Sequence, residues 1–134
     1  MKNIIFLFSF ICFTTAVLGQ GAKLNRAASL MDELNYSEAI ELYGEILEEE
    51  DNPDAKMQLA KAYRLKNDTK NAEYWYGQVV RLPQSKSIHK LYYGQMLQIN
   101  GKCDLAKTWF EKDVSEYPGD HRGQLLLASS DAKE

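Results

Sequence analysis

A pair of amphipathic helices separated by a short polar turn recurs along this chain of 134 residues. The clearest copy runs from Pro53 to Leu82, where apolar residues return every three or four positions on both sides of a turn at residues 66–69. That spacing places the apolar side chains of each half on one helical face. Because a single helix pair cannot bury its own apolar face, a chain of this kind must stack its pairs to make a core.

Several positions recur in the same phase and define the period. The second helix of each pair contains an alanine, at Ala39, Ala72 and Ala106, and these alanines are spaced by 33 and 34 residues. An aromatic residue follows each alanine by four positions, a β-branched core residue is predicted after the aromatic, and a small residue precedes each alanine by twelve positions. The aromatics are Tyr43, Tyr76 and Phe110, the β-branched residues are Ile46, Val79 and Val114, and the small residues are Ala27, Ala60 and Gly94.

These features resemble the tetratricopeptide-repeat (TPR) family, in which helix pairs repeat about every 34 residues. The resemblance covers Gly21 to Asp120 and implies an all-α fold. The expected architecture is a three-repeat TPR helical solenoid of antiparallel helix pairs within a domain at 20–134. The repeats are expected at about 21–52, 53–86 and 87–120, and a C-terminal capping helix at 121–131. The tryptophan that the family has early in each repeat is replaced by Lys23, Lys56 and Lys90.

Residues 1–19 have the layout of a secretory signal peptide. Lys2 is positive, residues 4–17 are almost entirely apolar, and Val17 and Gly19 are small residues three and one positions before the expected cleavage site. The apolar run is shorter than the about 20 residues that span a bilayer as a helix. An uncleaved membrane anchor is the alternative interpretation. The sequence therefore predicts an exported protein that resides in the periplasm or is associated with the outer membrane.

Motifs of catalytic and metal centres do not occur in the sequence. His89 and His121 are far apart and have no cysteine or acidic partner at metal-ligand spacing. The sequence also lacks a glycine-rich phosphate loop and the common hydrolase motifs. The net charge of −3 is opposite in sign to the basic surface of nucleic-acid-binding proteins. We therefore expect no enzymatic activity, no cofactor, no metal and no nucleic-acid partner, and we expect a protein or peptide partner instead.

The TPR resemblance implies a concave groove lined by the first helix of each pair, where such proteins bind peptides or partner helices. The groove positions are Leu24, Ala28, Met31 and Asp32, then Met57, Lys61, Arg64 and Leu65, then Leu91, Gln95, Gln98 and Ile99. The predicted partner-binding residues among them are Met57, Lys61, Arg64, Leu91, Gln95 and Gln98. Lys61 and Arg64 are three residues apart on one helix face and could hold a carboxylate or a peptide backbone. The alternative is that both are ordinary solvated charges.

A narrower resemblance concerns the third repeat, GKCDLAKTWFEKDVSEYPGD, and the sequence LLLASSD that follows it. Together with the signal peptide and the TPRs, these residues look like the N-terminal TPR segment of multidomain OmpA-family envelope proteins. The resemblance implies a scaffold module of the bacterial cell envelope. As an alternative function, it implies the N-terminal part of an OmpA-like, peptidoglycan-associated outer-membrane protein with a structural or secretion-machinery role.

The export prediction has a direct test. Cleavage after Gly19 leaves a mature protein that begins at Gln20, whose amine can cyclise. N-terminal mass spectrometry of the protein purified from expressing cells is expected to find Gln20, or its cyclised form, as the first residue. A chain that begins at Met1, or a protein that stays in the inner membrane, would contradict the prediction.

Overall fold

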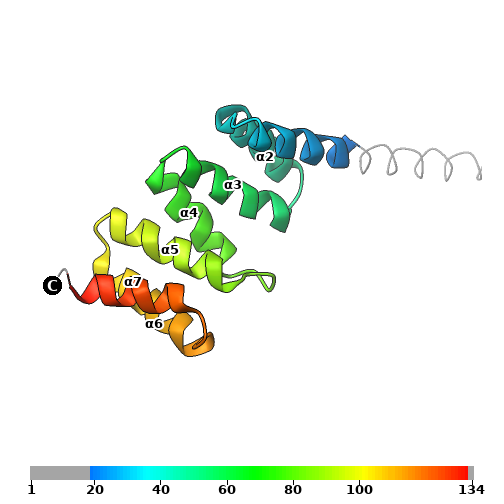
Figure 1. Ribbon diagram of the computed structural model, residues 1–134. Helices are drawn as coiled ribbons and strands as arrows, with labels where there is room; N and C mark the ends of the chain where they lie inside the picture. Colours follow the sequence, from blue (N-terminus) through cyan, green and yellow to red (C-terminus); the bar gives the residue numbers. More distant parts are fainter. Residues whose placement is uncertain (1–18, 133–134) are drawn as a thin grey trace, which may run out of the picture.

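The computed structural model describes residues 19–132, which form helices joined by short turns, without a strand in that range (Figure 1). The predicted signal segment lies outside the described residues except for Gly19. Within residues 19–132, no helix is long and apolar enough to cross a membrane. The helices are an N-terminal helix at 19–32, α2 at Tyr36–Glu49, α3 at Pro53–Leu65, α4 at Thr69–Val79, α5 at Ser87–Ile99, α6 at Cys103–Glu116 and α7 at His121–Asp131.

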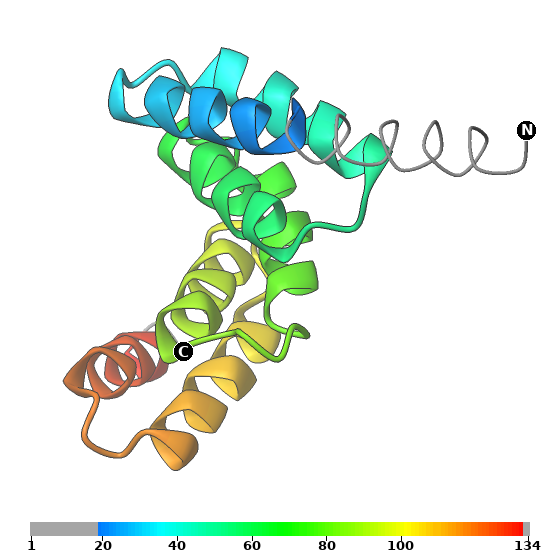
Figure 2. The same ribbon diagram turned by 90° about the vertical axis from the view of Figure 1, so that its right-hand side faces the viewer.

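Consecutive helices pack against one another in pairs, and the pairs stack into a curved solenoid. The N-terminal helix and α2 form the first repeat, α3 and α4 the second, and α5 and α6 the third. Helix α7 covers the exposed end of the third repeat. Figure 2 shows the N-terminal helix, α3, α5 and α7 following the inner side of the curve, with α2, α4 and α6 behind them. The predicted solenoid with a terminal helix is therefore confirmed.

The turn inside each repeat has the same backbone conformation. Leu34, Asn67 and Gly101 all have positive φ angles, of 60°, 63° and 82°. Each of them lies five residues before the alanine of its second helix, so the turn follows the same period as the core. Glycine adopts this left-handed conformation without strain, whereas leucine pays a steric cost for it. The sequence predicts a left-handed stop at Gly101 but not at Leu34.

The sequence predicts helix caps at Ser37, at Asn52, at Asp68 or Thr69 and at Ser87, and a helix start at His121. The structure confirms three of these five predictions. The Asn52 side chain accepts a hydrogen bond from Ala55 N at 2.9 Å ahead of Pro53, and Asp68 accepts one from Asn71 N at 3.2 Å. Helix α7 begins at His121, as predicted. The predictions that Ser37 and Ser87 cap helices are wrong, because both serines already lie inside α2 and α5. The Ser87 hydroxyl instead donates to Asp120 at the start of α7.

The core consists of the recurring positions. Tyr43, Tyr76 and Phe110 are buried, as are the alanines that precede them by four residues. Close packing is tightest at Gly94 of α5, where an added Cβ atom would lie 2.4 Å from Cε1 of Phe110. A small residue at this position therefore lets α5 approach α6 over the aromatic ring, as the repeat pattern predicts.

One core residue differs from the prediction. Asp113, and not Val114, occupies the buried position three residues after Phe110, and its exposed fraction is 0%. Val114 is only half-buried. The equivalent residues of the first two repeats are Ile46 and Val79, three residues after their aromatics. The prediction is wrong because Val114 lies four residues after Phe110, whereas helix geometry buries the residue at the constant spacing of three.

Polar contacts also join the second repeat to the third. The Thr69 hydroxyl donates to Asn100 Oδ1 at 2.7 Å, and Asn100 Nδ2 donates to the Thr69 carbonyl and to Glu73. Lys102 forms an ion pair with Glu73 at the same place. These contacts tie the start of α4 to the turn between α5 and α6.

Two helical glycines provide a matched test of this packing. Gly94→Ala is expected to destabilise the protein by about 1–3 kcal/mol, because the new methyl group must displace Phe110. Gly44→Ala in α2 is expected to stabilise it by roughly 0.5–1 kcal/mol, since no atom lies within 4 Å of the new Cβ and alanine favours the helix. Urea unfolding followed by circular dichroism measures both changes. Equal effects of the two substitutions would contradict the close approach at Gly94.

Candidate binding groove

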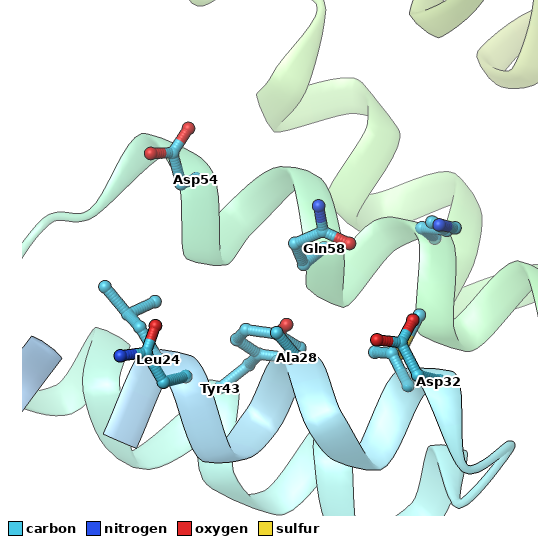
Figure 3. Close-up of a pocket in the computed structure, with 9 residues that line it drawn as sticks. Leu24, Ala28, Asp32, Tyr43, Asp54 and Gln58 are labelled. Carbon is cyan, nitrogen blue, oxygen red and sulfur yellow. The ribbon is translucent and has the colours of Figure 1, made fainter. Parts of the chain in front are cut away.

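The inner face of the solenoid carries two cavities, and the first lies between the N-terminal helix and α3. Its volume is about 400 Å³. Figure 3 shows Leu24 and Ala28 on the N-terminal helix facing Asp54 and Gln58 on α3. The cavity is lined by Leu24, Asn25, Ala28, Met31, Asp32, Tyr43, Asp54, Gln58 and Lys61.

The first cavity combines an apolar floor with polar edges. Leu24, Ala28 and Met31 supply aliphatic surface, and Tyr43 of α2 lies behind them with 1% of its surface exposed. Burial, helped by the nearby Asp32 charge, raises the pKa of the Tyr43 hydroxyl. The side chains at the edge include amides, carboxylates and an exposed lysine. Amide side chains pair well with the backbone of an extended peptide because each carries both donors and an acceptor.

The second cavity lies between α5 and α7 and has a volume of about 360 Å³. Its walls are mainly apolar. Leu91 forms part of the core and is 1% exposed, whereas Leu125 of α7 is 71% exposed. The lining residues are Ile88, Leu91, Tyr92, Gln95, Arg122, Leu125 and Leu126. A cavity of this composition suits an aliphatic or aromatic side chain.

Arg64 of α3 connects the second repeat to the wall of the second cavity. Its Nε atom donates a hydrogen bond to the Tyr76 hydroxyl at 3.2 Å, and its guanidinium carbon lies 3.9 Å from the centre of the Tyr92 ring. Tyr92 in turn lines the second cavity. Burial raises the pKa of Tyr76, and the hydrogen bond from Arg64 acts in the opposite direction. The two tyrosines therefore hold the guanidinium in a fixed position on the inner face.

The structure distributes the predicted partner-binding residues over different places. Lys61 lines the first cavity, and Leu91 and Gln95 line the second. Met57 packs half-buried against the core of the second repeat, and Gln98 is half-buried, but neither lines these two cavities. Leu91 can offer a partner only a small surface. Contact of the six residues with a partner stays a prediction.

Sequence reasoning missed several lining residues that share a simple signal. Two positions before and one position after the small residue of each first helix, the side chain points to the inner face. These residues are Asn25 and Ala28, Gln58 and Lys61, and Tyr92 and Gln95, of which Asn25, Gln58 and Tyr92 were not predicted. In α7, Leu126 has the same signal, since it lies two positions before Ala128, which follows Gly94 by 34 residues. Arg122 and Leu125 lie at other positions and do not have this signal.

The two histidines lie at the starts of α5 and α7. His89 is half-buried on α5, where its Nδ1 accepts a hydrogen bond from Lys86 N at 3.1 Å, and burial lowers its pKa. His121 is exposed at the start of α7. In the part of the chain that the structure describes, no group of three or more histidine, cysteine or acidic side chains is placed to hold a metal ion.

Solved structures share this architecture, although neither a protein-family model nor a curated protein sequence matches the chain. The second TPR domain of human RPAP3, in complex with the HSP70 peptide SGPTIEEVD, has a TM-score of 0.71 and 24% identity, covering 81% of this chain and 92% of that one. The first TPR of Spaghetti (RPAP3), bound to the HSP90 peptide SRMEEVD, has a TM-score of 0.73 and 20% identity, covering 85% and 91%. The chain therefore has the TPR fold. These solved structures do not support the resemblance to OmpA-family envelope proteins.

The link between Arg64 and Tyr92 can be measured with a double-mutant cycle. Arg64→Gln and Tyr92→Leu are expected to be coupled by about 0.5–2 kcal/mol, the range for a partly desolvated cation over an aromatic ring. Urea unfolding of the two single variants and the double variant gives the coupling. Lys112, whose Nζ lies 5.1 Å from the Trp109 ring centre on an exposed surface, provides the control pair and should be coupled more weakly. Additive effects of Arg64→Gln and Tyr92→Leu would show that the contact does not form.

Proposed function

We propose that this chain is a protein-interaction module that binds an extended peptide segment along the inner groove. The main support for the proposal is the order in which three features follow one another along the inner face. A cavity with polar edges, a positioned guanidinium and an apolar cavity follow one another from the N-terminal helix to α7. An extended peptide needs partners for its backbone and pockets for alternate side chains, and this face offers both.

The two cations of α3 support binding of an acidic group or of backbone carbonyls. Lys61 is exposed, and within residues 19–132 neither Lys61 nor Arg64 has an acidic partner among the ion pairs of the structure. By contrast, the acidic run at residues 48–51 is partly neutralised, because Lys23 pairs with Glu49 and Lys56 pairs with Asp51. Among the described residues, the inner face of α3 therefore carries two cations without an acidic partner, Lys61 and Arg64, beside one unpaired carboxylate, Asp54.

The similar solved structures also support a peptide-binding role. The RPAP3 domain and the Spaghetti domain each hold a short peptide that ends in the acidic sequence EEVD. We extend to this chain only the general mode, a peptide held by a stack of TPR helix pairs. Catalysis forms no part of the proposal.

The proposed cellular setting is the bacterial envelope, and it rests on the signal-like segment at residues 1–19. In that setting the chain would hold a partner protein in the periplasm or at the outer membrane. The alternative role, as the N-terminal part of an OmpA-like peptidoglycan-associated protein, is favoured by the same segment. Cell fractionation tests the setting, and sedimentation with purified peptidoglycan is expected only for the alternative role.

The groove can be tested by site-specific photocrosslinking in cells. A crosslinking amino acid at Gln58 or Gln95, on the inner face, is expected to give adducts with a partner protein, whereas the same group at exposed Tyr74 of α4 is not. Replacing both Lys61 and Arg64 by Glu should reduce the adducts at Gln58 and Gln95 at least tenfold, because losing a buried charged contact costs about 2–5 kcal/mol. Adducts only at Tyr74 would place the binding site on another surface.

A charge control and a stability control accompany the experiment. Replacing Glu48, Glu49 and Glu50 by Gln is expected to leave adduct formation nearly unchanged, since this run lies at the end of α2 away from both cavities. Arg64 also contacts Tyr76 and Tyr92, so its replacement weakens the packing of the repeats. The Lys61→Glu variant alone, which breaks no such contact, separates loss of binding from loss of stability by its thermal unfolding curve.

A further inference from the structure

A buried carboxylic acid stands where the repeat pattern calls for an aliphatic side chain. Asp113 of α6 lies three residues after Phe110, as Ile46 and Val79 lie three residues after their aromatics. All three side chains have exposed fractions of 0%. The first two repeats therefore present a methyl-rich surface at this position, and the third presents a carboxyl group. The difference falls at the interface with α7, the last helix.

The Asp113 carboxyl group has no hydrogen-bond partner. Neither of its oxygens is bonded within the described residues. The hydroxyl group of Ser87, which also influences Asp113, donates its single proton to Asp120 Oδ2 at 2.9 Å. Leaving an ionised carboxylate buried without partners is costly, and such groups usually become neutral instead.

Helix α7 lies directly over this carboxyl group. A Cβ atom on Gly123 would lie 2.6 Å from Asp113 Oδ2 and 3.2 Å from Val114 Cγ2, so only glycine allows the observed approach. Leu126 and Leu127 of α7 pack beside it against the core of the third repeat. The docked helix α7 therefore covers Asp113 on one side.

The charged groups around Asp113 are engaged with one another. On α5, Lys90 pairs with Glu116 of α6. On α7, Arg122 binds the carboxylate of Asp120 through two nitrogens, and Asp131 pairs with Lys107 of α6 at 2.7 Å. The histidines of the two neighbouring helices, His89 and His121, hydrogen-bond within their own helix starts.

Burial raises the pKa of Asp113 above its usual value. The hydroxyl of Ser87 acts against this effect, the negative charge of Asp120 adds to it, and the cations Lys90 and Arg122 act against it again. The direction agrees with the geometry, because a buried carboxyl group whose oxygens accept no hydrogen bond from the described residues favours the neutral form.

We propose that docking of α7 is coupled to the binding of a proton at Asp113, so that α7 docks more firmly as the pH falls and loosens as it rises. A group whose pKa is raised in the docked state contributes stability below its undocked pKa and loses it as the pH rises through the docked value. Asp120 works in the other direction, since Arg122 holds its pKa low, and its contribution is lost only in stronger acid. The coupling therefore operates above the ordinary pKa of an aspartate side chain, which is about 4.

The coupling reaches the groove because α7 forms one wall of the second cavity through Arg122, Leu125 and Leu126. When α7 loosens, the cavity between α5 and α7 loses that wall. This step rests on the proposed peptide-binding function, and it makes binding at the C-terminal half of the groove stronger in mild acid. The first cavity, between the N-terminal helix and α3, contains no residue of α7 and is not affected.

Hydrogen exchange measured by mass spectrometry on the chain without a partner tests the docking directly. After correction for the intrinsic rates, protection of the amides of α7 is expected to fall as the pH rises from about 5 to about 8, while protection of α2 and α3 stays constant. Asp113→Asn should abolish the pH dependence. Asp113→Val, which restores the residue type of the first two repeats, should also abolish it and keep α7 protected throughout. Glu111→Gln, which neutralises an exposed acid on the same helix, should retain the dependence of the natural chain.

Two outcomes would overturn the coupling. One is constant protection of α7 in the natural chain over this pH range, and the other is an unchanged pH dependence in Asp113→Asn. Gly123→Ala tests the same contact without altering a charge, since alanine favours a helix but must push α7 away from Asp113. Loss of α7 protection in this variant at every pH supports the close approach, and full protection contradicts it. None of these measurements uses a partner, so a failed photocrosslinking experiment and a failed docking experiment remain distinct.

Discussion

The close approach of helices over a buried aromatic ring is the contact on which the rest of this fold depends. At Gly94 no side-chain atom separates the α5 backbone from the Phe110 ring, and alanine serves the same purpose in the other repeats. This contact sets the distance between the helices of a pair. Because neighbouring pairs share the same geometry, it also sets the curvature and aligns the first helices along the inner side (Figure 2).

The groove is a consequence of that alignment. In every first helix, the side chains two positions before and one position after the small residue point to the inner face. Residues that pack in the core and residues that line the groove therefore lie close together in the sequence. Arg64 is held at this boundary, because its guanidinium rests on Tyr92 of the next repeat and bonds to Tyr76 of its own. Side chains that a partner could contact are therefore positioned by the packing of the repeats, and loss of packing between α3 and α5 would also displace the cation.

Much of the fold could be predicted because its signals are local and repeated. Asn52, Pro53 and Asp68 mark helix starts by their own chemistry, and the aromatic positions repeat three times. The left-handed Leu34 could not be predicted, since its conformation is imposed by the packing of two helices against the preference of leucine. The groove was predicted in part. Lys61, Leu91 and Gln95 line cavities, but the walls supplied by α7 depend on a helix without a repeat of its own.

The last interface of a solenoid faces a different constraint from the interior ones. In the first two repeats the next helix pair covers an aliphatic residue, and the apolar contact continues along the stack. Helix α7 has no partner helix after it within the described residues, and its residues Leu125 and Ser129 are exposed. A buried acid at Asp113 makes this interface weaker than the others when ionised. Since each repeat contacts mainly its neighbours, α7 can loosen without unfolding the repeats before it, and a pH-dependent contact is tolerated at this end of the stack where it would not be in the middle.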